Sequence, residues 1–223
     1  STADSTAEGG FSTAEGGSST AEAYRERALN AHRSAAALNP RDPDLRFNVA
    51  STLDDAGCLD EAIAEYRAAL RIAPAHAVAH NNLALALEQR GVAPTADVLH
   101  HLEAAVDLDP TDADVWLNLG HLRRKNGDLD AALAAYERAA TTPGNTTKNP
   151  AKADAHLAAA QVAAELGKLQ LAIDHAKPAT RLAATPDDHA VARDLLRELL
   201  VIWRDTLDDD DDDVEGGGGV ASP

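Results

Sequence analysis

The feature that most constrains the fold of this chain is a regular spacing of glycines. Gly57 and Gly91 lie 34 residues apart, Gly91 and Gly127 lie 36 apart, and Gly127 and Gly167 lie 40 apart. A period of this length is typical of proteins in which one supersecondary unit recurs and each copy buries its apolar face against its neighbours. The sequence therefore predicts a stack of similar units, lengthened by two and then by six residues.

Prolines follow the same period at a different offset. Pro40, Pro74 and Pro110 are separated by 34 and 36 residues. Glycine accepts the left-handed backbone that often ends a helix, and the residue before a proline is pushed out of the helical conformation. We therefore expect two helices in each repeat, the first ending at the glycine and the second before the proline. The additional residues fall at 92–97 and 141–150, in connections where added length is tolerated.

Small residues recur at fixed positions when position 1 of each repeat is set at residues 43, 77, 113 and 153. Position 8 reads Ala50, Ala84, Gly120 and Ala160, position 20 reads Ala62, Val98, Ala132 and Ala172, and position 27 reads Ala69, Ala105, Ala139 and Ala179. Such side chains let two helix backbones approach closely. Hydrophobic residues make up 44% of the chain but aromatic residues only 3%, which also favours packed helices over a β-sandwich or barrel.

This pattern resembles the tetratricopeptide repeat (TPR) family, in which a repeat of 34 residues forms a pair of helices. The resemblance covers residues 23–186. It implies an all-α fold, an α-solenoid of antiparallel helix pairs with about four repeats.

The two ends of the chain depart from the repeat. Residues 23–39 are interpreted as the second helix of an N-terminal half repeat, and residues 188–207 as a C-terminal capping helix. The apolar residues expected on one face of this capping helix are Val191, Leu195, Leu199 and Ile202. We expect residues 1–22 to form a disordered low-complexity segment and residues 208–223 a disordered acidic and Gly-rich tail, which leaves the solenoid at 23–207.

The net charge of −17 is concentrated at the ends of the chain. Residues 1–22 hold four acidic residues and residues 205–223 hold eight, with no Lys or Arg in either segment. The 25 acidic residues between them are nearly balanced by 20 basic ones. Nucleic-acid binding needs a basic surface, so we expect no nucleic-acid partner.

The sequence also bears on where the protein acts. No apolar run is long enough for a membrane span, and the N-terminus lacks the basic and apolar regions of a signal peptide. The single cysteine, Cys58, cannot form an intrachain disulfide, which favours a reducing compartment. We expect an intracellular protein, cytoplasmic or nuclear, with no membrane partner. Because the sequence contains no Met, we expect a processed product or a part of a longer protein.

The resemblance implies that the first helices of the repeats line a concave groove that receives a ligand. Position 6 reads Asn48, Asn82, Asn118 and then Ala158. Each asparagine amide offers a donor and an acceptor, so a row of them can hold the backbone of an extended peptide. The row resembles the asparagine ladder in the TPR arm of O-GlcNAc transferase. The alternative is that asparagine is simply frequent at this position in the family.

Apolar and charged residues complete the predicted groove. Phe47, Leu85 and Leu117 would present apolar surface to a ligand, unless neighbouring first helices cover them. The further candidates for contact with a ligand are Asn81, His121, Arg124 and Lys125.

Catalytic signatures are missing from the sequence. It has no phosphate loop, no nucleophile motif and no paired carboxylates in a supporting context, so we expect no catalytic residue and no cofactor. His76 and His80 lie four residues apart, but no further ligand pattern completes a metal site, so we predict no metal.

The function best supported is a non-catalytic scaffold that binds a peptide or a protein segment. One alternative is the substrate-selecting arm of a larger enzyme, such as an O-GlcNAc transferase-type protein glycosyltransferase whose catalytic domain lies outside this sequence. A second alternative is self-assembly through the ends of the array, and the oligomeric state stays open.

Overall fold

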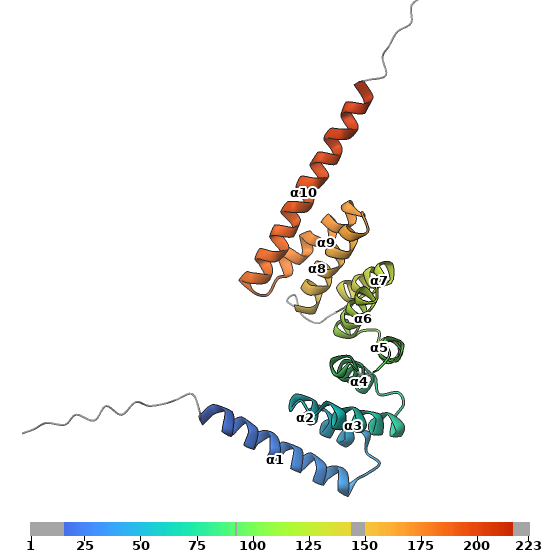
Figure 1. Cartoon of the computed structure of the whole chain (residues 1–223), viewed down its shortest axis with the longest axis vertical. Helices are drawn as coiled ribbons and strands as arrows, with labels where there is room; N and C mark the ends of the chain where they lie inside the picture. The colour runs from blue at the N-terminus through green and yellow to red at the C-terminus, as the bar shows by residue number, and fades with distance from the viewer. Residues whose placement is uncertain (1–15, 92, 144–149, 216–223) are drawn as a thin grey trace, which may run out of the picture. The chain divides into compact units, whose positions relative to one another are not determined.

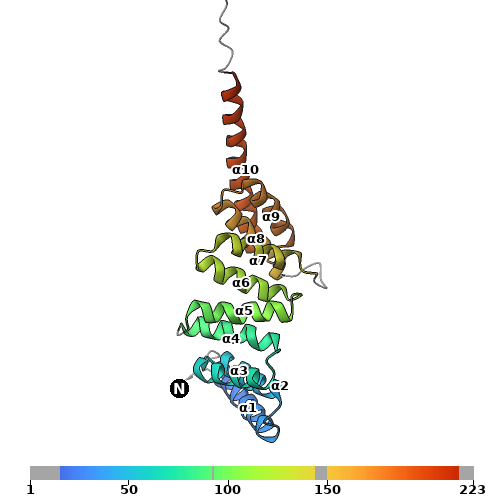
Figure 2. The same ribbon diagram turned by 90° about the vertical axis from the view of Figure 1, so that its right-hand side faces the viewer.

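A computed structural model describes the backbone of residues 16–91, 93–143 and 150–215, and the side chains of 22–91, 93–143 and 151–206. All regular secondary structure in these residues is helical. The helices are α1 (Gly16–Leu38), α2 (Pro43–Asp55), α3 (Leu59–Ile72), α4 (Ala77–Arg90), α5 (Thr95–Leu108), α6 (Ala113–Lys125), α7 (Leu129–Thr141), α8 (Pro150–Glu165), α9 (Leu169–Leu182) and α10 (Pro186–Glu215) (Figure 1). They follow one another as antiparallel pairs (Figure 2), so the predicted all-α fold of the α-solenoid class is confirmed.

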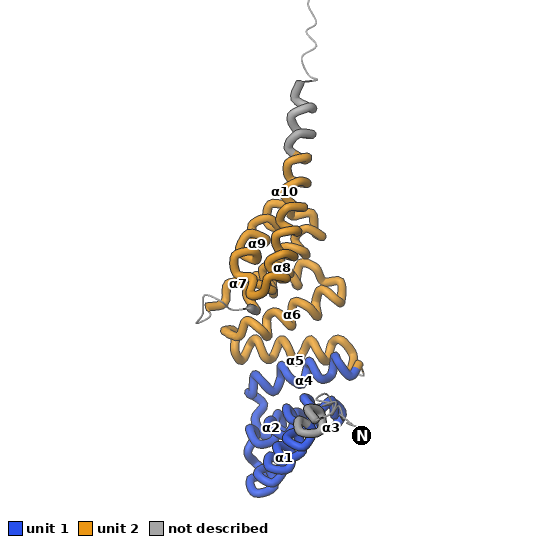
Figure 3. Tube along the Cα trace, turned by 90° about the vertical axis from the view of Figure 1, so that its left-hand side faces the viewer, with its two compact units in different colours: residues 1–90 blue, residues 91–223 orange. Residues whose placement is uncertain are grey.

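The chain divides into two compact units, residues 1–90 and 91–223 (Figure 3). In unit 1, each helix from α1 to α4 packs against the next, and α2 also contacts α4. In unit 2, each helix from α5 to α10 packs against the next, and α6 also contacts α8. Each unit therefore places the first helices of two successive repeats side by side, as stacked antiparallel pairs require.

The glycines end the first helices as predicted. Beyond the end of α2, Gly57 has a φ of +75°, and this left-handed turn lets the backbone N–H of Cys58 donate to the Leu53 carbonyl at 2.9 Å. That hydrogen bond satisfies a carbonyl that the helix itself leaves without a partner. The other glycines with positive φ are Gly91, Gly127 and Gly167.

The first helices of two repeats also begin at matching caps. Asp42 precedes α2, and its side chain accepts hydrogen bonds from the backbone N–H groups of Asp44 at 3.0 Å and Leu45 at 3.4 Å. Asp112 caps α6 in the same way. Because these bonds satisfy N–H groups with no partner inside the helix, the caps fix where each first helix starts.

The predicted small positions are buried. The alanines at positions 8, 20 and 27, together with Val98, are each at most 2% exposed. Gly120 gives the clearest case, because a Cβ atom added there would lie 2.5 Å from Cε1 of Tyr136. The backbone of α6 thus approaches the ring of Tyr136 on α7 so closely that only hydrogen fits.

Both predicted boundaries of the helical region are displaced outwards. α1 begins at Gly16, before the predicted boundary at 23, and α10 continues past 207 to Glu215. Once a helix has been nucleated, each further residue adds a backbone hydrogen bond at little cost, so a helix can extend past the residues that pack. The disorder predicted for the remainder of both ends concerns residues 1–15 and 216–223, which lie outside the described residues.

The predicted apolar face of the capping helix is buried only in part. Leu199 is 2% exposed and Leu195 is half-buried, but Val191 and Ile202 are 52% and 45% exposed. Ala192, which is 1% exposed, belongs to the buried face instead. Ala192 and Leu199 are seven residues apart and share a stripe of the helix, and the small side chain of Ala192 permits close packing there.

Candidate functional site

The residues predicted to contact a ligand fall into two groups, one in each unit. In unit 1 they are Phe47 and Asn48 on α2, and Asn81, Asn82 and Leu85 on α4, which we call the unit 1 face. These two helices are in contact. Leu85 is 37% exposed and the other four side chains are half-buried.

A chain of polar side chains fixes the amide of Asn82. Its carbonyl oxygen accepts a hydrogen bond from the Asn81 amide at 3.2 Å, and its own amide donates to the hydroxyl oxygen of Tyr66 at 3.4 Å. The Tyr66 hydroxyl donates to the carboxylate of Asp54 at 3.3 Å. An asparagine amide has two N–H donors and two acceptor lone pairs. Within the described residues these bonds use one of each, which leaves one donor and one acceptor of Asn82 for a ligand.

Burial keeps the Tyr66 hydroxyl protonated. The pKa of Tyr66 is raised to about 12, first by burial, and this outweighs the hydrogen bond from Asn82, which lowers it. Burial also raises the pKa of Asp54 above its ordinary value, while the hydrogen bond from Tyr66 opposes that rise. Tyr66 therefore stays a hydrogen-bond donor to Asp54 and an acceptor for Asn82 at neutral pH.

Phe47 is engaged inside unit 1. Its ring stacks on His76 with centroids 5.1 Å apart and lies 5.8 Å from the ring of Tyr66. His76 in turn accepts a hydrogen bond from the backbone N–H of Ala79 at 3.2 Å and lies 3.3 Å from Asp44. These contacts support the alternative in which neighbouring side chains cover Phe47. Leu85 is therefore the main apolar side chain that this face exposes.

The second group of predicted residues lies on α6 of unit 2. Leu117, Asn118, His121, Arg124 and Lys125 form what we call the unit 2 face. Leu117 is half-buried and packs against the core of unit 2. Asn118 is also half-buried, whereas His121 and Lys125 are exposed.

Arg124 is already held by α8. Its guanidinium donates to the side-chain oxygen of Gln161 at 3.0 Å and forms a short ion pair with Glu165. A ligand that used Arg124 would have to displace one of these partners. Gln161 and Glu165 occupy positions 9 and 13 of the fourth repeat, but this register does not show that they pair with Arg124.

His121 pairs with the second buried tyrosine. The Tyr136 hydroxyl lies 2.9 Å from Nδ1 of His121, and the two rings meet edge to face with centroids 5.3 Å apart. Burial is the main reason that the pKa of Tyr136 is raised to about 12. Tyr66 and Tyr136 thus each present a protonated hydroxyl to a residue of the predicted faces.

Acidic side chains lie beside the unit 2 face, and Asp154 was not among the residues predicted from the sequence. The pKa of Asp154 on α8 is raised by burial first, and then by the nearby carboxylates of Asp188 and Asp114, whereas His121 lowers it. Burial, followed by Asp112, raises the pKa of Asp114 as well. The signal was present in the repeat register, because Asp114 and Asp154 both occupy position 2.

A histidine pair also escaped prediction. Nδ1 of His156 on α8 lies 3.0 Å from Nδ1 of His175 on α9, and Nε2 of His175 lies 3.6 Å from Glu137. The pKa of His156 is lowered to about 4, mainly by burial and then by His175, Arg181 and Lys152. A neutral His156 imidazole on α8 therefore contacts His175 on α9 at neutral pH.

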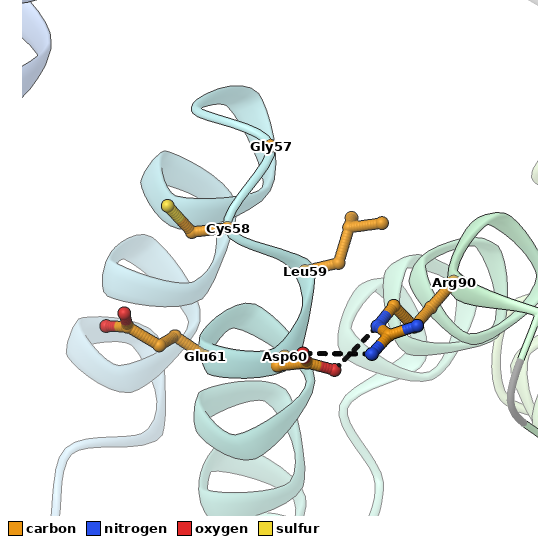
Figure 4. Close-up of a pocket in the computed structure, with 6 residues that line it drawn as sticks. All are labelled: Gly57, Cys58, Leu59, Asp60, Glu61 and Arg90. Carbon is orange, nitrogen blue, oxygen red and sulfur yellow. Dashed lines mark hydrogen bonds and ion pairs between the residues drawn. The ribbon is translucent and has the colours of Figure 1, made fainter.

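One shallow depression lies at the turn between α2 and α3. It has a volume of about 270 Å³ and is lined by residues that include Cys58, Asp60 and Arg90 (Figure 4). Arg90 donates to both carboxylate oxygens of Asp60, at 2.8 and 3.2 Å, which ties α3 to α4. Its polar lining is thus occupied by an ion pair within unit 1.

The described residues offer neither a metal site nor a membrane span. Across the described side chains, no group of three or more His, Cys, Asp or Glu residues could hold a metal ion. His80, one of the two spaced histidines, lies with Nε2 3.0 Å from the Pro74 carbonyl oxygen. None of the helices in the described ranges is both long and apolar enough to cross a bilayer.

Two curated proteins are similar in sequence to this chain. Human (Homo sapiens) tetratricopeptide repeat protein 7B is 32% identical over 115 residues, which is 50% of this chain and 13% of that protein. The mouse (Mus musculus) protein O-mannosyl-transferase TMTC1 is 29% identical over 117 residues, which is 51% of this chain and 9% of that protein. The chain therefore spans only about a tenth of the length of these relatives.

Solved structures and family models agree on the fold. The crystal structure of YrrB, a TPR protein with an unusual peptide-binding site, matches with a TM-score of 0.59 at 21% identity over 78% of this chain and 84% of YrrB. Residues 55–91 match a family model for the TPR repeat, and residues 101–134 match a second one for the tetratricopeptide repeat. Together with the helix pairs and the left-handed glycines, these matches show that the chain carries tetratricopeptide repeats within a helical repeat fold.

Proposed function

We propose that this chain binds an extended peptide, or an extended segment of another protein, along the first-helix faces of its repeats. The observation that carries the proposal is the fixed amide of Asn82. Because Asn81 and Tyr66 hold it from two sides, little rotamer freedom is lost when a peptide binds, and pre-organisation of this kind favours affinity.

The chemistry of the unit 1 face suits a peptide backbone. A peptide group offers one N–H and one C=O, and Asn82 retains one acceptor and one donor to match them. Asn48 occupies the same repeat position on α2, the neighbouring first helix. Leu85, one helical turn beyond Asn82, can add an apolar contact to a ligand side chain. On unit 2, Asn118 is the corresponding candidate.

The experiment compares the wild-type chain with the triple variant Asn48→Ala, Asn82→Ala, Asn118→Ala. A display library of random peptides selects ligands for the wild type, and calorimetry then measures their affinities for each protein. The matched control is Asn30→Ala, which removes an exposed asparagine amide from α1, a helix that contributes to neither face. Circular dichroism checks that all three proteins are equally helical.

We expect peptides to bind the wild type and the control equally and the triple variant at least ~10-fold more weakly, because each lost amide removes about 1 kcal/mol of hydrogen bonding. Peptides that bind all three proteins equally would contradict the asparagine clamp. Failure to select any peptide would contradict the proposed function itself.

A second proposal is that the chain is the substrate-selecting arm of a larger protein glycosyltransferase, for which the O-GlcNAc transferase type was the sequence-based expectation. Its support is the similarity to part of protein O-mannosyl-transferase TMTC1. Sequencing the full open reading frame tests it. A glycosyltransferase domain in the same polypeptide would favour this proposal, and its absence from the complete reading frame would remove it.

A further inference from the structure

The last helix, α10, exposes apolar side chains beyond its packed first half. In its first half, Ala192 and Leu199 are buried, and Leu195 and Leu196 pack against the core of unit 2. Further on, Leu200, Val201, Ile202 and Trp203 are 39–45% exposed, and Figure 1 shows α10 extending past α8 and α9. Four consecutive large apolar residues are uncommon on a helix that faces only solvent.

The residues of one stripe of α10 follow a heptad pattern. Counting alternately three and four residues along the helix gives Arg193, Leu196, Leu200, Trp203, Leu207 and Asp210. These spacings place all six positions on one side of the helix, where coiled coils bury their seam. The stripe is apolar at its four inner positions, basic at its first position and acidic at its last.

The apolar and charged positions of this stripe match those of an identical stripe that runs in the opposite direction. We propose that α10 pairs with α10 of a second copy of this chain as an antiparallel two-helix seam. A two-fold axis between Val201 and Ile202 sets Leu200 of one copy opposite Trp203 of the other. By register, Leu196 then meets Leu207 and Arg193 meets Asp210 of the second copy.

The charges along α10 favour a second copy of the chain as its partner, and they favour the antiparallel orientation. A parallel pair would place the run Asp208 to Asp213 of one copy beside the same run of the other, which is strongly repulsive. The antiparallel pair instead brings that run towards Arg193 and Arg197, whose side chains are 55% and 66% exposed. The residues that follow α10 within this sequence, 216–223, offer Val220 as their one large apolar side chain, so they are a poor cover for the stripe.

The test measures the mass of the full 223-residue chain by light scattering and sedimentation over a range of concentrations. We expect a dimer of about twice the 23.3 kDa of one chain. Leu200→Glu and Trp203→Glu each place a charge on the seam of both copies and should raise the dimer dissociation constant about 100-fold. The matched control Val191→Glu changes a side chain that is 52% exposed and off the stripe, and it should leave the constant unchanged.

A charge swap tests the register. Arg193→Asp and Asp210→Arg should each weaken the dimer, because each sets like charges opposite one another, and the double variant should restore it. A wild-type chain that stays monomeric at high concentration would overturn the proposal, as would a dimer that is indifferent to Leu200→Glu and Trp203→Glu. Weakening by the seam variants without restoration by the double swap would overturn the antiparallel register.

Discussion

In Tyr66 and Tyr136 the ring and the hydroxyl group have different roles. The rings of Tyr66 and Tyr136 are fully buried between the helices of their repeats, and each hydroxyl reaches a polar residue of a first helix, Asn82 or His121. Packing of the core and orientation of the candidate site therefore share the same side chains. If the proposed peptide binds at these faces, this coupling lets residues buried in the repeat influence a ligand that they do not touch.

The first prediction concerns Gly120, which lies under the ring of Tyr136. In an exposed helix, Gly→Ala stabilises by about 1 kcal/mol because alanine loses less backbone entropy. At Gly120 the added Cβ would lie 2.5 Å from the ring, so we expect Gly120→Ala to lower the free energy of unfolding by ~1–3 kcal/mol.

Urea unfolding measures this cost, and a double-mutant cycle with Tyr136→Ala identifies its origin. The cost of Gly120→Ala should largely disappear when the ring is absent, because the clash is with that ring alone. A gain in stability from Gly120→Ala in the wild-type background would show that the helices do not approach this closely.

At the scale of elements, the first and second helices of a repeat differ in how their N-termini are capped. The caps Asp42 and Asp112 hydrogen-bond through their side chains to the starts of α2 and α6. Asp128 stands at the equivalent place before α7, but its side chain forms no capping hydrogen bond. The same residue type at the same kind of position therefore has unequal roles, because the tight turn after Gly127 holds Asp128 in a different backbone conformation.

This difference gives the second prediction. Asp112→Ala should lower the free energy of unfolding by about 1 kcal/mol, because two backbone N–H groups lose their acceptor. Asp128→Ala removes the same group from a cap position without such bonds and should cost less than about half as much. Thermal unfolding of both variants at low salt checks the ranking, and equal costs would contradict the capping assignment.

Helix ends proved more predictable from the sequence than helix faces. Gly57 and Pro74 mark where helices stop through local backbone preferences, so spacing alone placed them. Val191 and Ile202 were expected on the apolar face of the capping helix, but they are exposed, because which stripe of α10 packs depends on how it crosses α9. The engagement of Arg124 with residues of α8 was out of reach for the same reason, since those partners are 37 and 41 residues away in sequence. Contacts between helices need three-dimensional register, which a single sequence does not supply.

At the scale of the whole molecule, helices touch mainly their neighbours in sequence. Contacts in each unit run from one helix to the next and to the next first helix. In such arrays, stability approximates a sum of local terms and interfaces between neighbours. A change confined to one interface should therefore loosen nearby helices first and distant ones least. The histidine pair between α8 and α9 provides a way to test this.

The third prediction follows from His156. Its pKa is lowered from 6.5 to about 4 in the folded chain, so the unfolded chain binds more protons between these values. The stability that depends on a neutral His156 is therefore complete above pH ~6.5 and is lost as the pH falls towards 4.

On acidification from pH 7 to pH ~5, we expect hydrogen exchange, corrected for its intrinsic pH dependence, to accelerate in α8 and α9 and to change much less in α2 and α3. His156→Gln, which cannot be protonated in this range, should remove most of the acceleration. Equal loss of protection in both units, or an unchanged response in His156→Gln, would show that acid acts on the array as a whole and not through this one interface.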